Sequence, residues 1–289
     1  MSEQTKIRLL WQRLSFLFLP LAVLLAILLA GCGPSPEELQ AVDYVPLTRE
    51  DWQVSTPGEQ GLDPVLVAEL YHHAAELETL YGLLVVKNGY LIGEDYFNEG
   101  SPDQKALLQS AAKSYVSALV GMALEQGCLS SVEQKMIDFF PDFADQIEDP
   151  RTKQITILDM LQMRAGFPPE ESDPELWEAV WSGDYVHHLV DFPLTSDPGT
   201  KFQYSNLTTH WLGIILARAC DTDLESFAQA YLFDPLGGEV GSWRKDLDGY
   251  NWGAGEIHVS ARDTAKFGQL YLNDGNFEGQ QIVPADWVN

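Results

Sequence analysis

Apolar and polar positions alternate in recognisable patterns along most of the chain after residue 58. Two apolar runs, 83–87 and 90–92, flank Asn88-Gly89, and this arrangement is the strongest short-range signal for a β-hairpin. Apolar segments bounded by helix start and stop signals predict helices at 63–80, 111–126, 156–166, 207–219 and 262–273. The pattern therefore predicts a mixed α and β fold, with helices dominating its middle.

The ends of these helices carry specific capping residues. Asp63-Pro64 offers an N-cap followed by proline at the first helical position. Thr156-Ile157-Leu158-Asp159 is a variant of the capping box, and Gly127 and Gly166 stop two of the helices. Residues 33–58 hold four prolines and several acids without a sustained period. We interpret them as a tether and linker.

The first 32 residues have the pattern of a targeting segment. Three basic residues precede an apolar run from Leu14 to Ala30, which ends in Leu29-Ala30-Gly31-Cys32. A basic start, an apolar middle and small residues before a cleavage site are typical of an export signal. An uncleaved membrane helix is the alternative, because the run nearly reaches spanning length. Gly31-Cys32-Gly33-Pro34 would continue a helix poorly, which favours the export signal.

The ending Leu29-Ala30-Gly31-Cys32 resembles the signal of bacterial lipoproteins, whose cysteine becomes the lipidated first residue of the mature protein. This resemblance implies a signal peptide at residues 1–31, a lipid anchor at Cys32, a tether at 32–58 and a folded domain at 59–289. It also implies an exported protein that is lipid-anchored to the cell envelope membrane.

Composition limits the classes of function that remain. Hydrophobic residues make up 45% of the 289 residues, which is typical of a globular chain. Asp and Glu number 43 against 17 Lys and Arg, and the net charge of −26 disfavours nucleic-acid binding. Three cysteines are too few for a disulfide-rich scaffold or a four-thiolate zinc site. Beside Cys32, Cys128 and Cys220 either pair in an exported protein or are buried thiols at two helix ends.

Ser110-Ala111-Ala112-Lys113 is the first candidate for chemistry. On a helix, residues i and i+3 share a face, so the Ser110 hydroxyl and the Lys113 amine can meet. A serine hydroxyl needs an adjacent base to act as a nucleophile, and a lysine among apolar neighbours can lose its proton and serve as that base. The helix start also offers backbone N–H groups for an oxyanion. Taken alone, an N-cap serine followed by a surface lysine is the simpler interpretation.

Tyr204-Ser205-Asn206 is the second candidate. The motif follows a turn and an extended piece and precedes an apolar helix. In an extended segment residues i and i+2 point the same way, so Tyr204 and Asn206 can face one site. A phenol near a lysine can carry protons, and an amide can bind a substrate carbonyl. The alternative is that Asn206 is a helix N-cap and Tyr204 a half-buried aromatic residue.

Together, Ser110-x-x-Lys113 after a hairpin and Tyr204-x-Asn206 downstream resemble the serine β-lactamase and penicillin-binding-protein superfamily, in which Ser-x-x-Lys is a catalytic motif. The resemblance is closest to the class C-like branch, which also holds carboxylesterases, D-aminopeptidases and nylon-oligomer hydrolases. It covers residues 82–289. Four stretches carry it, namely 113–121, 161–166, 198–206 and 253–263.

The resemblance implies an α/β (α+β) fold in which helices flank an antiparallel sheet and one subdomain is all helical. It implies that Ser110 attacks a carbonyl carbon and carries the acyl group, that Lys113 takes or relays the serine proton, and that Tyr204 acts as the second base. Asn206 would bind substrate or position Lys113 and Tyr204. The implied partner is a small ester, amide or peptide substrate, and no cofactor is implied.

One part of the family pattern is not found. The third motif, His or Lys followed by a variable residue and Gly, does not occur on a strand that we predict after Tyr204-x-Asn206. The chain stops at residues 284–289, shortly before the closing strands and last helix that the resemblance implies. We therefore expect the C-terminal strands, with half of the oxyanion hole, to be missing and the chain to be a fragment of an active enzyme.

The remaining histidines and glycines do not indicate a further site. His72-His73 and His187-His188 are adjacent pairs, which diverge on a helix, so we expect no metal site. The glycine-rich stretch 249–255 lacks a following Lys-Ser/Thr and is interpreted as a loop rather than a phosphate cradle. His210 is interpreted as a helix-face residue.

Two functions from different classes remain open. The first is a lipid-anchored serine hydrolase that cleaves an ester or amide by acyl transfer through Ser110. The second is a non-catalytic envelope protein that keeps the fold for binding, or an inactive fragment. Trp177 and Trp181 are either ordinary packing residues or part of a substrate wall. The sequence does not identify the substrate, although the negative charge argues against anionic polymers.

Overall fold

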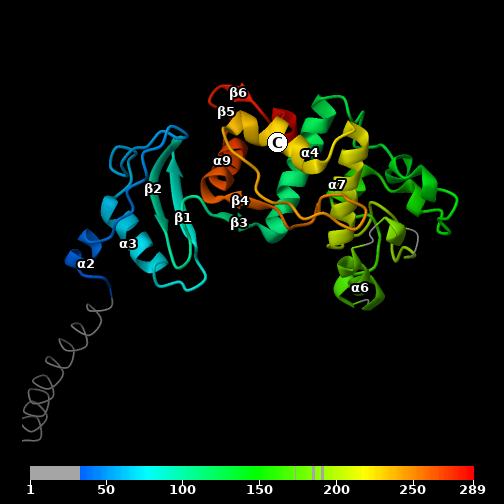
Figure 1. Ribbon diagram of the computed structural model, residues 1–289, viewed down its shortest axis with the longest axis horizontal. Coiled ribbons are helices and arrows are strands. Elements are labelled where there is room, and N and C mark those ends of the chain that lie inside the picture. Colours follow the sequence, from blue (N-terminus) through cyan, green and yellow to red (C-terminus); the bar gives the residue numbers. More distant parts are fainter. Residues whose placement is uncertain (1–32, 173, 184–185, 190–191) are drawn as a thin grey trace, which may run out of the picture. The chain divides into compact units, whose positions relative to one another are not determined.

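The computed structural model describes residues 33–172, 174–183, 186–189 and 192–289 and divides into two compact units (Figure 1). Unit 1 holds the described residues up to Thr48 and residues 54–98, and unit 2 holds residues 49–53 and 99–289. The predicted signal peptide and Cys32 lie outside the described residues. Within the described ranges, no helix has both the length and the apolar character needed to cross a membrane.

Unit 1 contains the predicted hairpin. β1 (Gly82–Lys87) and β2 (Tyr90–Tyr96) pair antiparallel. Asn88 and Gly89 have φ angles of 53° and 84°, the left-handed conformations that a two-residue turn between twisted strands requires. The sequence prediction of a hairpin is confirmed.

α3 (Pro64–Ala74) packs on this hairpin. The Asp63 side chain accepts a hydrogen bond from the Val65 N–H at 2.8 Å, which confirms the predicted N-cap. The Tyr71 hydroxyl, fully buried, donates to the Leu83 carbonyl oxygen of β1 at 3.1 Å. Helix and hairpin are therefore joined by a polar contact as well as by apolar packing.

α3 ends earlier than the sequence predicts, at Ala74 rather than near residue 80. The residues that follow form turns, and the carbonyl oxygens of Leu77 and Leu80 accept hydrogen bonds from the Asn98 side-chain amide at 3.0 and 2.7 Å. These carbonyls therefore bind the chain just after β2 instead of continuing the helix.

Residues 33–48 and 54–58 are part of unit 1, whereas residues 49–53 belong to unit 2. The stretch that we interpreted as a tether and linker is therefore folded, and its role as a tether stays a prediction. It contains a short helix, α2 (Pro36–Gln40), and runs along β2. The Glu94 N–H donates to the Tyr44 carbonyl oxygen at 2.9 Å, and the Ser55 N–H donates to the Leu91 carbonyl oxygen at 3.1 Å. The physical reason is that β2 has an edge without a second strand, whose backbone groups need partners.

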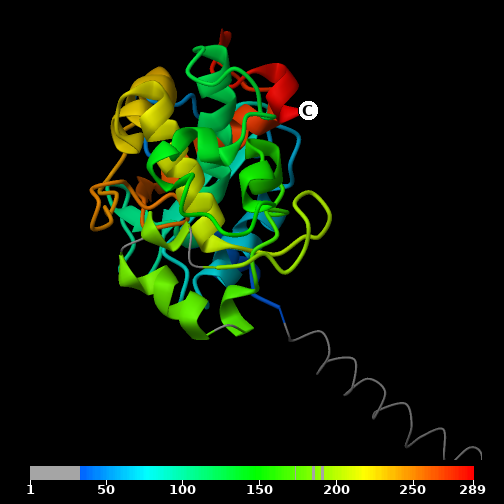
Figure 2. The same cartoon turned by 90° about the vertical axis from the view of Figure 1, so that its right-hand side faces the viewer.

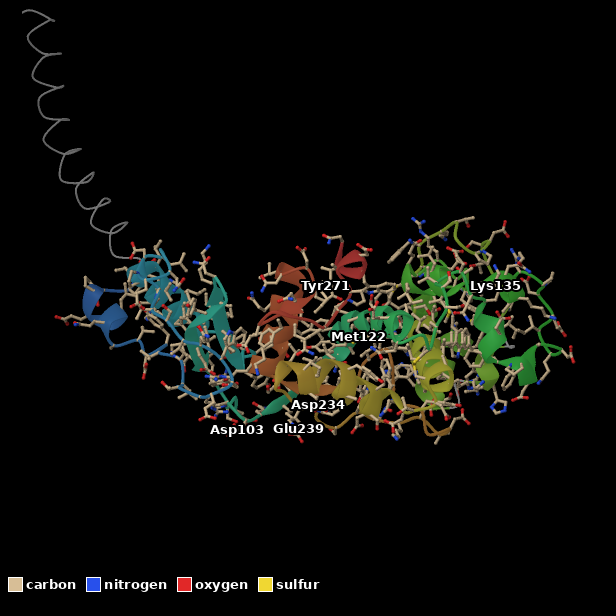
Figure 3. The ribbon with its side chains drawn as sticks, turned by 90° about the horizontal axis from the view of Figure 1, so that it is seen from above. Asp103, Met122, Lys135, Asp234, Glu239 and Tyr271 are labelled. Carbon is tan, nitrogen blue, oxygen red and sulfur yellow. A yellow bond between two sulfur atoms is a disulfide. The ribbon has the colours of Figure 1, made fainter. Side chains whose placement is uncertain are left out.

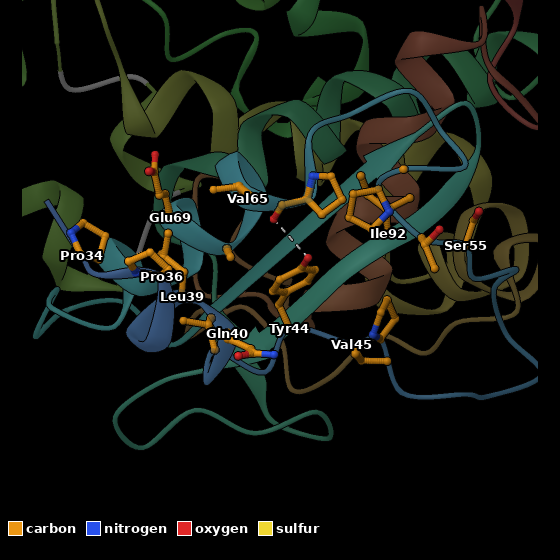
Figure 4. A pocket seen from close by; sticks show the side chains of 17 residues that line it. Pro34, Pro36, Leu39, Gln40, Tyr44, Val45, Ser55, Val65, Glu69 and Ile92 are labelled. Atoms are coloured by element: carbon orange, nitrogen blue, oxygen red, sulfur yellow. Dashed lines mark hydrogen bonds between the residues drawn. The ribbon is translucent and has the colours of Figure 1, made fainter.

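A groove of about 890 Å³ lies between this segment and α3 (Figure 4). Proline and aliphatic side chains make up most of its lining. The Tyr44 hydroxyl, which donates to the Pro64 carbonyl oxygen at 3.3 Å, is drawn there with its hydrogen bond.

The core of unit 2 is formed by α4 (Ala112–Glu125) and α7 (Asn206–Cys220), which pack against each other (Figures 1 and 2). Gly127, with φ 74°, follows the end of α4 as predicted. Cys128 and Cys220 stand at the C-terminal ends of the two helices and are joined as a disulfide, with their Cα atoms 5.0 Å apart. Of the two alternatives left by the sequence, the structure supports the disulfide.

Shorter elements surround this helix pair, and in Figure 3 Met122 of α4 lies in the interior of unit 2. They are β3 (Lys105–Leu107), α5 (Ile157–Leu161), α6 (Pro174–Ser182), α8 (Leu224–Ala228), β4 (His258–Ser260), α9 (Ala261–Leu272), β5 (Asn276–Phe277), β6 (Gln280–Gln281) and α10 (Ala285–Val288). Thr156 caps α5 with the predicted capping box, although the helix ends well before Gly166.

The three two-stranded ladders of the described residues, β1–β2, β3–β4 and β5–β6, are all antiparallel, and an isolated parallel bridge joins Val54 to Leu91 of β2. The predicted class, a mixed fold of helices and antiparallel strands, is therefore confirmed. The hairpin and α3 cluster with residues 33–48 and 54–58 rather than with the helices of unit 2, and the single domain from residue 59 stays a prediction.

Candidate active site

Ser110 lies where the chain passes from β3 into α4. Residues Gln109–Ala111 form a single 3-10 turn, η1, ahead of the helix. Gln109 has φ 48°, a left-handed conformation that is uncommon for a residue with a side chain and is typical of functional turns. The Leu108 N–H donates to the Ile257 carbonyl oxygen at 3.0 Å and holds the chain just before this turn. The Ser110 side chain is thereby exposed at the start of α4.

Lys113 stands one helical turn further along. Its Nζ is 3.2 Å from Ser110 Oγ, 2.9 Å from Asn206 Oδ1 and 2.8 Å from the Ala254 carbonyl oxygen. It also lies 4.9 Å from the centroid of the Tyr204 ring. The atoms closest to the amine are therefore oxygens, whereas the sequence analysis expected an apolar surrounding.

The Tyr204 hydroxyl contacts the same serine. It donates to Ser110 Oγ at 2.8 Å, and the side chain is 41% exposed. The extended piece before α7 is anchored by the Gln203 N–H, which donates to the Met163 carbonyl oxygen at 2.7 Å. The phenol and the amine thus meet at one hydroxyl oxygen.

Asn206 begins α7, but the N-cap is its neighbour Ser205, whose hydroxyl accepts from the Thr208 N–H at 3.0 Å. The side chains of Tyr204 and Asn206 both face the site, as the extended spacing predicted. The structure therefore brings all four predicted residues of the two motifs into one cluster, with Asn206 in contact with Lys113.

A comparison with protein-family models matches residues 79–288 to the Beta-lactamase family. The chain belongs to the beta-lactamase family. Its curated relatives include a 6-aminohexanoate-dimer hydrolase of Paenarthrobacter ureafaciens, 26% identical over 227 residues, which are 73% of this chain and 57% of the relative. The chain thus spans little more than half the length of that relative.

The fold of this chain is similar to that of several solved structures. The octameric penicillin-binding protein homologue from Pyrococcus abyssi is 17% identical, with a TM-score of 0.58 over 78% of this chain and 59% of the other. A beta-lactamase/D-alanine carboxypeptidase from Pseudomonas syringae is 20% identical, with a TM-score of 0.54 over 75% and 66%. These similarities establish the fold of the beta-lactamase family for this chain and, with the curated relatives, a hydrolase family.

Sequence reasoning missed Glu170, in the 3-10 turn η5 (Glu170–Ser172). This carboxylate is only 3% exposed and accepts hydrogen bonds from the Ser205 hydroxyl at 2.7 Å, the Asn206 Nδ2 at 2.9 Å and the Leu207 N–H at 3.0 Å. No periodicity or motif marks it, because it lies beside further acids in a turn. Its role comes from partners more than thirty residues away.

Sequence reasoning also missed the role of the glycine-rich loop. The Gly253 N–H donates to His210 Nδ1 at 3.1 Å, and His210 Nε2 lies 2.8 Å from Asp246 Oδ2. Because Nδ1 accepts a hydrogen bond, the imidazole is neutral and its Nε2–H donates to Asp246. Burial lowers the pKa of His210, and this outweighs the opposite effect of the adjacent carboxylate. The loop thus held presents the Ala254 carbonyl to Lys113.

Close backbone contact explains why glycine occupies this loop. A Cβ on Gly253 would lie 2.8 Å from the Thr209 carbonyl oxygen of α7, and a Cβ on Gly213 of that helix would lie 3.3 Å from the Gly253 Cα. Two glycines facing each other let the loop lie on the helix. This pair was the one signal in the sequence that could have indicated the contact.

Two further features of unit 2 bear on where a substrate could bind. A cavity of about 450 Å³ adjoins Lys113 and is bordered by α4 and α9. Trp177 and Trp181 of α6 are 44% and 56% exposed and meet edge to face, with ring centroids 5.8 Å apart. They are therefore not core packing residues, and their part in a substrate wall remains a prediction.

One histidine pair behaves differently from the prediction. Potential ligand atoms of His72, His73 and Glu76 all lie within 4.8 Å of one another, so adjacent histidines of α3 do not diverge as expected. The His73 Nδ1 is 3.3 Å from a Glu76 carboxylate oxygen, with both side chains more than half exposed. This contact explains the proximity of His73 and Glu76, and the absence of a metal site remains a prediction.

Proposed function

We propose that this chain carries the acyl-transfer site of a serine hydrolase that cleaves ester or amide bonds. The observation that supports the proposal is the convergence of Lys113 Nζ and the Tyr204 hydroxyl on Ser110 Oγ, at 3.2 and 2.8 Å. A hydroxyl becomes a nucleophile when a base within hydrogen-bond reach can take its proton. Here two groups that can carry a proton stand within that reach.

The contacts of Lys113 define its proposed role. A neutral amine has two N–H bonds and one lone pair. The Ala254 carbonyl oxygen and Asn206 Oδ1, at 2.8 and 2.9 Å, accept the two N–H bonds. The lone pair is then directed at the remaining neighbour, Ser110 Oγ, and can take its proton.

The proposed reaction proceeds in two halves. As Ser110 Oγ bonds to the substrate carbonyl carbon, its proton passes to Lys113, and the negative charge develops on the carbonyl oxygen. The Ser110 backbone N–H, at the start of the η1–α4 helical segment, is suited to stabilise that oxygen. Tyr204 gives a proton to the leaving alcohol or amine as the carbon–heteroatom bond breaks. In the second half, a water molecule gives a proton to the Tyr204 phenolate while its oxygen bonds to the acyl carbon. Lys113 returns the serine proton to Ser110 Oγ as the bond from Ser110 to the acyl carbon breaks and the acid leaves.

Two observations support the substrate class that we propose. The curated relative from Paenarthrobacter ureafaciens is named for hydrolysis of the 6-aminohexanoate dimer, and another solved structure of this fold is described as EstCE1, a hydrolase with promiscuous acyltransferase activity. We propose a small ester or linear amide as substrate. The net charge of −26 disfavours an anionic polymer.

Labelling with a fluorophosphonate probe tests the proposal. We expect covalent modification of Ser110 in the native protein, located by mass spectrometry, and none in Ser110→Ala. Lys113→Ala should slow labelling by a factor on the order of 10²–10⁴, the usual contribution of a general base. Ser101→Ala, in an exposed turn of unit 2, is the matched control and should label normally. A folded native protein that is not labelled would support the non-catalytic binding protein instead.

We also propose that the protein is exported and lipid-anchored through Cys32. The support is the sequence pattern of residues 1–32 alone. Cells expressing the protein and fed labelled palmitate should yield a labelled, membrane-associated chain, and Cys32→Ala should abolish the label. Label that persists in Cys32→Ala, or that never appears in the native protein, contradicts the anchor.

A further inference from the structure

Glu170 is a buried carboxylate outside both sequence motifs, and all its hydrogen bonds go to the start of α7. Oε1 accepts from the Ser205 hydroxyl and the Leu207 N–H, and Oε2 accepts from Asn206 Nδ2. Burying an ionised carboxylate is costly unless such donors compensate it. These three donors stabilise the buried Glu170 carboxylate, and one of them links it to Asn206.

The Asn206 amide is held between two partners that allow only one orientation. Glu170 as a carboxylate can only accept, so it requires the NH₂ group at 2.9 Å. An ammonium on Lys113 can only donate, so it requires the carbonyl oxygen at 2.9 Å. Without the carboxylate, the amide could turn over and present its NH₂ group to Lys113.

Such a turn would change what the lysine can do. An NH₂ group facing the neutral amine would donate to its lone pair, the same lone pair that must accept the Ser110 proton. The amine would then be hydrogen-bonded in a way that blocks proton transfer, although every residue of the two motifs remained in place.

We infer that Glu170 is a positioning residue, which locks the Asn206 amide so that the lone pair of Lys113 faces Ser110. The inference rests on the proposed acyl-transfer function. Glu170 touches neither Ser110 nor substrate in this account. It acts through Asn206, and therefore governs the rate of acylation rather than the binding of the acylating reagent.

Fluorophosphonate labelling of Ser110 in the full chain measures both quantities, as a limiting rate and a half-saturating probe concentration. The glutamine in Glu170→Gln can present either end of its amide to Asn206, so the orientation of the Asn206 amide is no longer fixed. We expect the limiting rate to fall about tenfold or more, within the range that proton-transfer groups contribute. The half-saturating concentration should stay unchanged. Glu171→Gln, the exposed neighbour in the same turn, is the matched control and should keep both values.

A second variant separates this role from mere stabilisation of α7. Ser205→Ala removes the N-cap and one Glu170 contact but leaves the contact between Glu170 and Asn206. It therefore measures how far destabilisation of the start of α7 alone slows the labelling of Ser110. In an Asn206→Ala background, Glu170→Gln should cause no further loss of rate, because the residue it acts through is gone.

The outcomes are distinct. If the native protein is not labelled, the proposed function fails and this inference fails with it. If the native protein is labelled and Glu170→Gln labels as fast, the function stands and the inference alone is overturned. The inference is equally overturned if Ser205→Ala slows labelling as much as Glu170→Gln does, or if the losses from Glu170→Gln and Asn206→Ala simply multiply.

Discussion

Two regions of unit 2 support the same amine by different means. At the start of α7, the Glu170 carboxylate accepts from Asn206, whose oxygen then accepts from Lys113. In the loop after residue 250, the imidazole of His210 accepts from the Gly253 N–H, and the Ala254 carbonyl oxygen accepts from Lys113. Each region delivers one oxygen to Nζ, and together they leave Ser110 as its third neighbour.

The difference lies in what each support requires. The α7 support depends on the orientation of a side-chain amide, which can turn over without moving the backbone. The loop support delivers a backbone carbonyl, which can be lost only if the loop itself shifts. The α7 support therefore fails when the Asn206 amide turns over. The loop support fails when the close packing of the loop on α7 is disturbed.

Gly253→Ala should break the loop support and has the largest effect that we expect from a change in either support. The new Cβ would lie 2.8 Å from the Thr209 carbonyl oxygen, a backbone atom of α7 that cannot move aside. We expect the loop to shift, lowering the unfolding free energy by about 1–3 kcal/mol and slowing Ser110 labelling on the order of tenfold to a hundredfold. Labelling kinetics and thermal unfolding measure the two effects.

Gly255→Ala is the matched control in the same loop. A Cβ at this position would have no neighbour closer than 3.5 Å, which is ordinary van der Waals contact. Its labelling rate and unfolding temperature should therefore remain close to those of the native protein. Equal losses in both variants would mean that the loop is sensitive to any side chain, and the close contact with α7 would lose its special role.

The same contrast explains how much the sequence could predict. Local signals identified the hairpin at Asn88-Gly89, the caps at Asp63 and Thr156, and the relation of Ser110 to Lys113, because each depends on residues a few positions apart. The meeting of Tyr204 with Ser110 was implied by the family resemblance rather than by spacing.

The supports could not be predicted in this way. Glu170 and Ala254 reach the site through contacts with residues 36 and 141 positions away, and neither has a local pattern that distinguishes it. The contacts of residues 33–58 with β2 could not be predicted for a related reason. Prolines disfavour a long helix or a central strand over that stretch, but they allow the short helix α2 that begins at Pro36. They also allow pairing with the edge of β2, where backbone partners are needed.

His210 gives the loop support a dependence on pH, the smallest of the expected effects. The charged groups that act on His210 are Asp246, Asp248 and Arg244, and burial outweighs them, so its pKa in the folded chain is lowered from the usual 6.5. On acidification His210 therefore takes up a proton in the unfolded chain at a pH at which it stays neutral in the folded chain. The contribution of His210 is complete above pH 6.5 and is lost as pH falls below it, by at most about 1.4 kcal/mol per pH unit.

Urea unfolding at pH 7.5, 6.5 and 5.5 measures this loss, and His210→Asn should show a shallower decline because it cannot gain a proton. Nitrogen chemical shifts of the His210 ring give a second test on the native protein, in which the neutral Nε2–H form should persist at pH 6. A doubly protonated ring at pH 6 would mean that Asp246 holds an imidazolium. The Gly253 N–H would then have lost its acceptor, and the loop would reach Lys113 without the help of His210.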